Sequence, residues 1–309
     1  MSYLKVFTNE LCKPSNIHYE VHEWTPLKLI AFSYWLGLYT RIMLNQRKKG
    51  RFKNIWYLDL LAGPGTNYVK TGAKGEVIAG SPFIAYHFAK DLFTKYVFIE
   101  ADKERKEALE RRVSVLKIPN VDIYHGDCNE VIDRLDLSSA DHYLAFIDCE
   151  GVDIRWSPTI LKLLKNPGDL LITFQTKELT RTLGRASKGY EDAKVLTDFI
   201  GDDRWRKAKT GEELLSLYMD RLKEYRTYVN SIKIECKKFR YDLVLACKMG
   251  PYVETWEYLK NRLERFRDKH VKVVLEIMSG KCGTLDKFGS RRSLYEYSSK
   301  TFKPKTVHL

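Results

Sequence analysis

The sequence lacks the cysteine patterns of secreted and zinc-binding proteins. Its six cysteines stand at positions 12, 128, 149, 236, 247 and 282, and no two of them form a Cys-x-x-Cys pair. This spacing suits neither a zinc knuckle nor a disulfide framework, so we expect a reducing, cytoplasmic environment. The seven histidines are scattered along the chain as well, and we predict no metal site.

Long apolar runs are also missing. The longest uncharged apolar stretch, residues 29–40, lies between Lys28 and Arg41 and is shorter than the ~20 residues that span a bilayer. The first ten residues, MSYLKVFTNE, lack the apolar core of a signal peptide. We therefore expect no association with a membrane.

What the sequence does contain is an excess of positive charge. The 53 lysines and arginines outnumber the 40 acidic residues and give a formal net charge of +13. A basic surface favours polyanions such as RNA or DNA, although lysine can also serve solubility alone. With 309 residues and 44% hydrophobic content, the chain can form one large domain or two small ones.

The pattern predicts three segments. Residues 1–54 form an N-terminal helical extension, in which 1–22 are irregular and a helix starts with Thr25 as N-cap and Pro26 at its first position. Residues 55–280 form the main domain, with a charged helical insertion at about 178–228. Residues 281–309 form a basic tail.

Apolar runs alternate with helical patterns in the main domain, which predicts an α/β fold. Such runs, covered on both faces by helices, are typical of parallel strands. The strands are expected at 55–63, 96–101, 121–127, 143–148 and 168–176, and the runs 231–239 and 241–249 are expected to pair as an antiparallel hairpin. The sequence therefore predicts a mostly parallel, doubly wound sheet with a closing hairpin.

Acids stand at the ends of four of these strands. They are Asp59, Glu100, Asp127 and Asp148. A doubly wound sheet binds its ligand beyond the carboxyl ends of its strands. One or two such acids would suit structural salt bridges, but four indicate a nucleoside-binding site.

The segment after the first strand indicates which nucleoside. A dinucleotide fold would run from Gly-x-Gly-x-x-Gly directly into a helix. Here Gly63 and Gly65 are followed by the polar insertion TNYVKTGAKGEVIAG before Ser81 opens a helix. No helix N-terminus then supports a pyrophosphate, and we expect S-adenosylmethionine, which carries no phosphate.

With these residues established, the chain resembles the three-Cys-motif partner family, whose members are similar to class I methyltransferases. The likeness runs in order through EWTPLKL, YLDLLAGPG, GSPFIAY, FIEADKERKEAL, GDCNEVI, FIDCEG and DLVLACK. It implies a Rossmann-like methyltransferase sheet, an S-adenosylmethionine site and a protein partner that carries a three-Cys motif.

The resemblance also implies roles for the residues at the strand ends. Asp59, Gly63 and Gly65 match the loop around the methionine part of the cofactor. Glu100 matches the acid that binds the ribose, Asp127 meets the adenine amino group, and Cys128 lies against the ring. Ala62, Ser81 and Asp148 complete the predicted cofactor set.

FIDCEG departs from the Asp-Pro-aromatic-Gly pattern of the family. Asp148, Cys149 and Glu150 are the candidate catalytic residues. In one hypothesis Asp148 accepts a hydrogen bond from a target amine, while Trp156 or Phe174 stacks on the base. In a second, Cys149 attacks a pyrimidine ring, although neighbouring carboxylates would raise the pKa of its thiol. In a third, Cys149 is simply a small buried residue, and Glu150 orients the substrate or a nearby arginine.

Basic residues follow the fifth strand and are expected to contact phosphates: Lys177, Arg181, Arg185 and Lys188. A solvated helix face is the alternative. A second group surrounds Trp205: Arg204, Arg206, Lys207 and Lys209. We predict an S-adenosylmethionine-dependent methyltransferase that acts on nucleic acid, with RNA preferred to DNA. The alternative is a non-catalytic, nucleic-acid-binding or partner subunit of the same fold.

Overall fold

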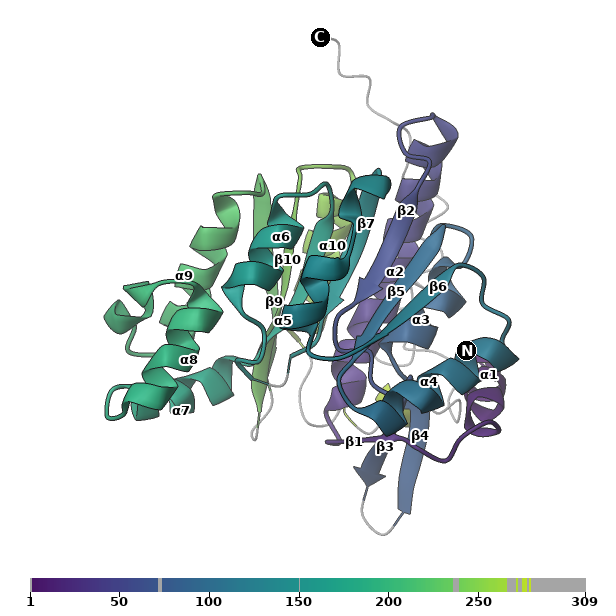
Figure 1. Ribbon diagram of the computed structural model, residues 1–309, viewed down its shortest axis with the longest axis horizontal. Helices are drawn as coiled ribbons and strands as arrows, with labels where there is room; N and C mark the ends of the chain where they lie inside the picture. The colour runs from purple at the N-terminus through teal and green to yellow at the C-terminus, as the bar shows by residue number, and fades with distance from the viewer. Residues whose placement is uncertain are drawn as a thin grey trace.

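A twisted seven-stranded sheet forms the centre of the computed structural model (Figure 1). The structure describes residues 2–71, 74–149, 151–235 and 239–265, together with Val271, 274–276 and Met278. The predicted basic tail and Glu150 lie outside these described residues. The strands are β2 (Ile55–Asp59), β5 (Lys95–Glu100), β6 (Val121–His125), β7 (His142–Ile147), β8 (Asp169–Phe174), β9 (Tyr228–Glu235) and β10 (Arg240–Cys247).

The order of the strands assigns the fold. In the sheet they follow as β6-β5-β2-β7-β8-β10-β9. The neighbouring pairs from β6 to β8 are parallel, whereas β10 is antiparallel to both β8 and β9. A parallel sheet with one reversed strand inserted before its last strand is the Rossmann-like arrangement of class I methyltransferases, so the predicted fold class is confirmed.

Helices cover both faces of the sheet. One face carries α2 (Thr25–Lys48), α3 (Ser81–Ala89), α4 (Lys103–Val115) and α10 (Tyr252–Leu263). The other carries α5 (Cys128–Val131), α6 (Leu161–Leu164), α7 (Thr176–Ala186), α8 (Tyr190–Ile200) and α9 (Gly211–Lys223). Short turns η1 (Ile132–Arg134), η2 (Leu137–Ser139), η3 (Trp156–Ile160) and η4 (Asp203–Lys207) connect them.

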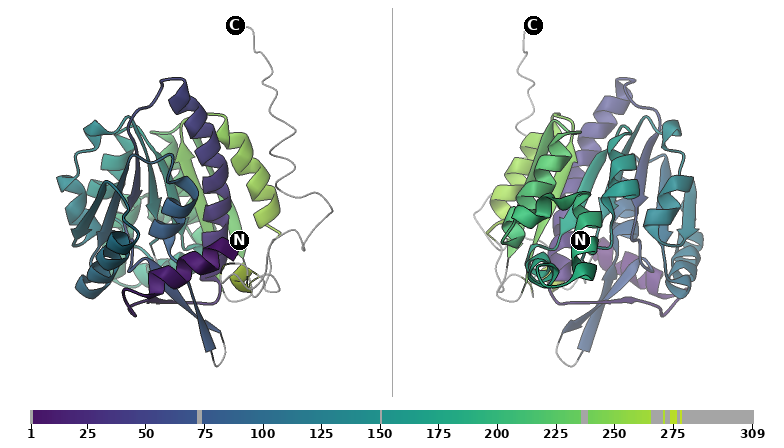
Figure 2. Two further views of the ribbon diagram at one scale, coloured as in Figure 1. Left: turned by 90° about the vertical axis from the view of Figure 1, so that its right-hand side faces the viewer. Right: turned by 60° about the vertical axis from the view of Figure 1, so that its left-hand side comes forward.

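The alternation of side chains along the strands creates two cores. On β2, Tyr57 packs into the core under α2 and α3, whereas Trp56 and Leu58 pack into the core under α5 to α9. Helix α2 is buried along most of its length and runs beside α10 (Figure 2), where the rings of Trp35 and Trp256 meet edge to face at 5.7 Å. The N-terminal helix is therefore part of the main core.

The prediction that residues 1–22 are irregular is wrong. They contain helix α1 (Ser2–Cys12) and strand β1 (Tyr19–Val21). Helix α1 forms because Phe7 and Leu11, one turn apart, both pack into the first core. Helix α2 starts at Thr25 itself, and Trp24 rather than Thr25 occupies the N-cap position.

The polar insertion after Gly65 is a β-hairpin. It consists of β3 (Thr66–Thr71) and β4 (Lys74–Ala79), and β1 pairs with β3 to complete a three-stranded sheet. This hairpin extends beyond the end of the main sheet at which β2 ends (Figure 1). The insertion therefore adds a second, small sheet next to the predicted site.

Candidate cofactor and substrate site

The four predicted acids lie along one edge of the sheet. Strands β6, β5, β2 and β7 are adjacent and parallel, so their carboxyl ends meet at that edge. Asp59 and Glu100 end their strands, and Asp127 and Asp148 follow within two residues. The fold therefore brings together residues that are up to 89 positions apart, between Asp59 and Asp148.

The glycine loop after β2 has a backbone that only glycine adopts easily. Gly63 has φ +61° and Gly65 has φ +83°. A Cβ on Gly65 would lie 2.1 Å from Cε2 of Phe83, whereas a Cβ on Gly63 would meet no atom within 4 Å. The amide of Gly80 donates to the carbonyl of Gly65 at 2.8 Å, which fixes the loop against the start of α3. Gly63 therefore faces open space and Gly65 faces the core.

Asp59 is a buried carboxylate with one oxygen unused. Its side chain is fully buried, and the phenol of Tyr57 donates to Oδ2 at 3.0 Å. Oδ1 has no hydrogen-bond partner. Burial raises the pKa of Asp59 to about 7, an effect that the hydroxyls of Ser81 and Tyr57 partly offset and the nearby Asp148 increases. A cationic ligand at Oδ1 would satisfy this oxygen and favour the charged form.

Glu100 and Asp127 are each held by the turn that follows them. Oε1 of Glu100 accepts a hydrogen bond from the amide of Asp102 at 2.8 Å, and only 8% of the residue is exposed. Asp127 is the N-cap of α5, where its Oδ1 accepts from both the amide and the side chain of Asn129. Cys128 is buried beside it, and burial together with Asp127 raises the pKa of its thiol to about 12.

Asn129 connects this turn to the loop after β7, a role that the sequence gave no reason to expect. Its side-chain amide donates to the carbonyl of Asp153 at 2.7 Å. Its oxygen accepts from the amide of Arg155 at 2.8 Å and from the hydroxyl of Thr159 at 2.7 Å. Buried amides with all their hydrogen bonds satisfied are rigid connections. Asn129 thus fixes the loop after Asp148 relative to the predicted adenine end.

Asp148 forms an ion pair with Lys28 of helix α2. The Lys28 ammonium lies 2.6 Å from Oδ2 and 2.7 Å from Oδ1, and the two side chains are only 10% and 16% exposed. Lys28 was not among the predicted site residues. An available sign was its position, since it is a single charge within a run of buried residues from Thr25 to Ser33.

Cys149 is buried, and its thiol is not exposed to a ligand as a nucleophilic thiolate needs to be. Its Sγ donates to the carbonyl of Thr173 at 3.3 Å, and its exposure is 1%. Burial raises the pKa of its thiol far above the ordinary value, and the charges of Asp148 and Asp153 raise it further. This environment opposes a nucleophilic role.

The two aromatic residues considered for base stacking belong to the second core. Trp156 is 1% exposed and packs between Tyr218 and Arg221, while Phe174 is fully buried against Phe199 and Tyr218. Neither ring is accessible to a base, so the proposal that they stack on substrate is wrong. Both side chains are large and apolar, and they are buried in the second core instead.

The basic residues after β8 lie on α7 and on the turn that follows it. Arg181 and Arg185 are exposed and pair with Glu178 and Asp192 at 2.8 and 3.3 Å, and Lys188 is exposed. Lys177 is only half-buried in the first turn of the helix. In the second basic group, Trp205 is buried and donates to Thr197, so this ring does not stack on a partner.

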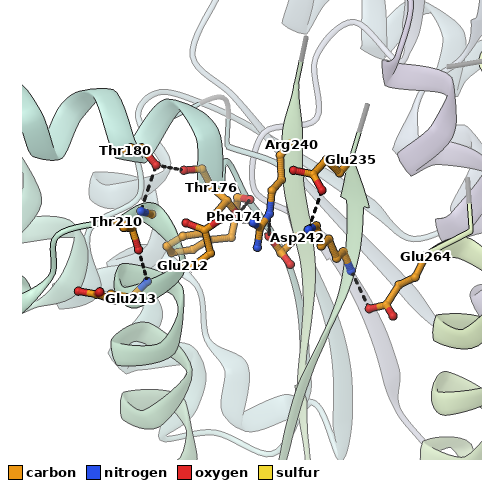
Figure 3. Close-up of polar contacts among 12 residues, drawn as sticks. Phe174, Thr176, Thr180, Thr210, Glu212, Glu213, Glu235, Arg240, Asp242 and Glu264 are labelled. Carbon is orange, nitrogen blue, oxygen red and sulfur yellow. Dashed lines mark hydrogen bonds and ion pairs between the residues drawn. The ribbon is translucent and has the colours of Figure 1, made fainter. Parts of the chain in front are cut away.

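Strand β10 runs in reverse, so its first residues, rather than its last, lie at the site edge. Arg240 and Asp242 are therefore brought beside the end of β8, since Asp242 is paired with Phe174. The hydroxyl of Thr176 donates to Asp242, and Arg240 bridges Asp242 and Glu212 (Figure 3). Burial raises the pKa of Asp242, and these partners offset part of the effect. The network joins α7, α9 and β10 next to the site.

Two other kinds of site find no support in the described part of the chain. No group of three or more His, Cys, Asp or Glu side chains there could hold a metal ion. None of the described helices has the length and apolarity needed to cross a membrane.

No family model matches the sequence, and no curated protein is similar to it. The structure is similar to the Legionella pneumophila protein LPL1258, with 14% identity and a TM-score of 0.46 over 80% of this chain and 92% of that chain. It is also similar to an rRNA methylase from Streptococcus thermophilus, with 13% identity and a TM-score of 0.38 over 71% and 97%. The structure is also similar to the bifunctional kinase-methyltransferase WbdD, with 14% identity and a TM-score of 0.43. The match covers 78% of this chain and 46% of that chain. The strand order, rather than these similarities, assigns the fold.

Proposed function

We propose that the chain is an S-adenosylmethionine-dependent methyltransferase that acts on nucleic acid, with RNA preferred to DNA. The observation that best supports the cofactor is Asp59, a fully buried carboxylate with one unpartnered oxygen at the end of the central strand of a class I methyltransferase sheet. A buried carboxylate oxygen without a hydrogen-bond partner is uncommon in native proteins, and at this edge of the sheet it is suited to accept a hydrogen bond from a cationic ligand.

The other residues at the edge fit the same cofactor. The open space beside Gly63 allows a ligand to approach the backbone closely, and we expect Ala62 and Ser81 to complete this part of the site. Oδ1 of Asp59 would accept the cofactor ammonium, and Glu100 would accept the ribose hydroxyls. Asp127 and Cys128 would lie at the adenine.

The bound cofactor would supply an electrophilic methyl group on a sulfonium. The protein would supply charge balance and alignment, which account for most of the rate in such a transfer. Lys28 holds Asp148 at 2.6 Å and thereby fixes the orientation of the carboxylate that would accept a hydrogen bond from the target group. Cys149 would anchor this loop through its hydrogen bond to the carbonyl of Thr173, while Glu150 keeps its predicted role in orienting the substrate.

The nucleic-acid substrate is supported by charge. The net charge is +13. Helix α7, which carries the exposed arginines, follows the carboxyl end of β8 and so begins at the site edge. Exposed ion pairs such as Arg181–Glu178 contribute little stability, so phosphate can replace the acid. Lys177, Arg185 and Lys188 would extend this contact. The resemblance also suggests a partner with a three-Cys motif.

A non-catalytic subunit is the second candidate, and one observation favours it. Both oxygens of Asp148 already lie within 2.7 Å of the Lys28 ammonium, in a loop that departs from Asp-Pro-aromatic-Gly. Such a protein would use the same fold to bind nucleic acid or a partner without transferring a methyl group.

Calorimetric titration with S-adenosylmethionine and S-adenosylhomocysteine tests the cofactor. We expect binding by the wild type, its loss in Glu100→Ala, and its retention in Glu104→Ala, which removes an exposed acid of the next helix. A well-folded wild type that binds neither ligand would contradict the proposal. Transfer of a labelled methyl group to RNA would then distinguish the enzyme from the non-catalytic subunit.

A further inference from the structure

Four aromatic rings form a stacked column beside the candidate site. His22 stacks on Trp24 at 4.4 Å, Trp24 on Phe239 at 4.8 Å, and Phe239 on Tyr241 at 5.7 Å. The interplanar angles are only 20°, 19° and 16°, so the four rings are nearly parallel. The column links the segment before α2 to the start of β10, which are more than 200 residues apart in sequence.

The column runs from solvent into the core. His22 is exposed and Trp24 half-buried, whereas Phe239 is 8% and Tyr241 2% exposed. Most ring contacts in the two cores are instead tilted or edge to face, as between Trp35 and Trp256. The inner rings thus anchor the column, and its outer end presents a ring to solvent.

The column also lies near the proposed point of methyl transfer. Trp24 precedes Lys28 by four residues, which is about 6 Å along a helix, and Lys28 contacts Asp148. From the other side, β8 lies between Asp148 and β10, and its Thr173 is paired with Leu243, two residues from Tyr241. Thr173 is fully buried, and its hydroxyl has no hydrogen-bond partner.

We propose that the His22 end of this column stacks a nucleobase of single-stranded RNA and thereby guides the strand to Asp148. Every base has a flat π-face, and protein surfaces that bind single strands use successive aromatic rings as platforms. The proposal rests on the proposed function for its substrate, but it concerns a binding site that the sequence analysis did not identify.

Binding of a fluorescein-labelled single-stranded RNA of about 12 nucleotides tests the proposal. We expect His22→Ala and Trp24→Leu to weaken binding about tenfold or more, the range produced by the loss of one base–aromatic stack. His22→Phe, which keeps a flat ring, is expected to bind the RNA about as tightly as the wild type. Tyr225→Ala is the matched control, because Tyr225 is an exposed ring near the opposite edge of the sheet.

Tryptophan fluorescence gives a second readout. Trp24 is half-buried, whereas the other five tryptophans are buried, at 9% exposure or less. We expect RNA to quench the emission of the wild type and to have little effect on that of Trp24→Leu.

Titration of S-adenosylhomocysteine into the same variants separates the two proposals. Weaker RNA binding with unchanged cofactor binding supports the column as a base platform. Unchanged RNA binding in both His22→Ala and Trp24→Leu, or a wild type that binds no RNA, overturns it while leaving the cofactor site intact. RNA binding through the column by a protein that binds no cofactor would uphold this inference and reject the methyltransferase.

Discussion

Asp59 combines two properties that are costly when a ligand is absent. It is fully buried, and one of its oxygens has no partner. An ionised carboxylate in this position loses its hydration without full compensation, which is why its pKa rises to about 7 from an ordinary value of 3.8. The folded chain therefore holds a proton there that the unfolded chain has released.

This raised pKa predicts opposite effects of pH on stability and on cofactor binding. Between about pH 4 and 7, the contribution of Asp59 to the free energy of unfolding should fall as pH rises, because this carboxyl binds an extra proton in the folded state. Cofactor affinity should increase over the same window, by up to about tenfold per pH unit, since the ammonium pairs with the ionised carboxylate. Calorimetry with S-adenosylhomocysteine across this range measures the effect. Asp59→Asn should bind weakly with no such dependence, and an equally steep dependence in this variant would contradict the assignment.

Lys28 is the second residue whose environment indicates a role. Replacing it with Met leaves Asp148 without its cation, and we expect a loss of about 2–3 kcal/mol in the free energy of unfolding, somewhat less than for a fully buried pair. Methyl transfer should fall at least about tenfold while S-adenosylhomocysteine affinity changes little, and Lys28→Arg should restore part of the activity.

Urea unfolding and a methyl-transfer assay measure these two effects. Lys70→Met is the control, because the Lys70–Glu20 pair is exposed at 65% on both sides and its loss should leave stability and activity unchanged. Full activity in Lys28→Met would show that the ion pair serves only the fold.

At the scale of the elements, the glycine loop is the part that cofactor binding and packing share. Gly63 and Gly65 have similar left-handed backbones, but only Gly65 lies against a side chain. The two positions therefore separate the cost of the backbone conformation from the cost of a steric clash.

Alanine at each position should give different losses of stability. Gly63→Ala should lose about 1 kcal/mol, the penalty of the left-handed conformation. Gly65→Ala should lose about 3 kcal/mol, because its Cβ would also overlap Phe83. Urea denaturation compares them, and equal losses would mean that Phe83 moves aside. Gly63→Ala should still weaken cofactor binding, since its methyl group enters the open space.

The elements that were predictable are those that local pattern defines. Strands β2, β5, β6, β7 and β8 were recognisable as mainly apolar runs, and the acids that end or follow the first four stand next to them in the chain, so both could be predicted. Strand β1 has three residues and pairs with β3 across 48 positions, and Lys28 meets Asp148 across 120 positions. No local pattern contains such contacts. Arg240 and Asp242 were missed because β10 is reversed, so that its first residues lie at the site.

At the scale of the whole molecule, Arg112 joins the N-terminal segment to the glycine loop. This α4 side chain is fully buried and donates to the carbonyls of Leu11, Ser15 and Ile17, and to that of Pro64 at 2.6 Å. Burial lowers its pKa to about 10. The residues before α2 are thus fixed to the cofactor loop, which explains why the predicted N-terminal extension is part of the main domain.

Arg112→Met should release this connection. We expect a loss of about 3–4 kcal/mol in the free energy of unfolding, because four carbonyls, three of them in buried hydrogen bonds, lose their donor. Proteolysis near residues 11–17 should also become faster. Arg111→Met, which alters a side chain that is 58% exposed, should change neither quantity. Unchanged cleavage in Arg112→Met would show that the segment is held by its apolar contacts alone.

The acceptors of Arg112 have a consequence for how this protein can vary in evolution. All four are main-chain carbonyls, which every amino acid carries. Residues 15 and 17 can therefore change type while the hydrogen bonds persist, whereas position 112 needs the five N–H groups of a guanidinium. Leu11 is constrained separately, because its side chain packs in the core. A deep mutational scan should find position 112 intolerant and positions 15 and 17 more permissive. Correlated substitution between homologues should then fail to reveal this contact, although it is among the most buried in the molecule.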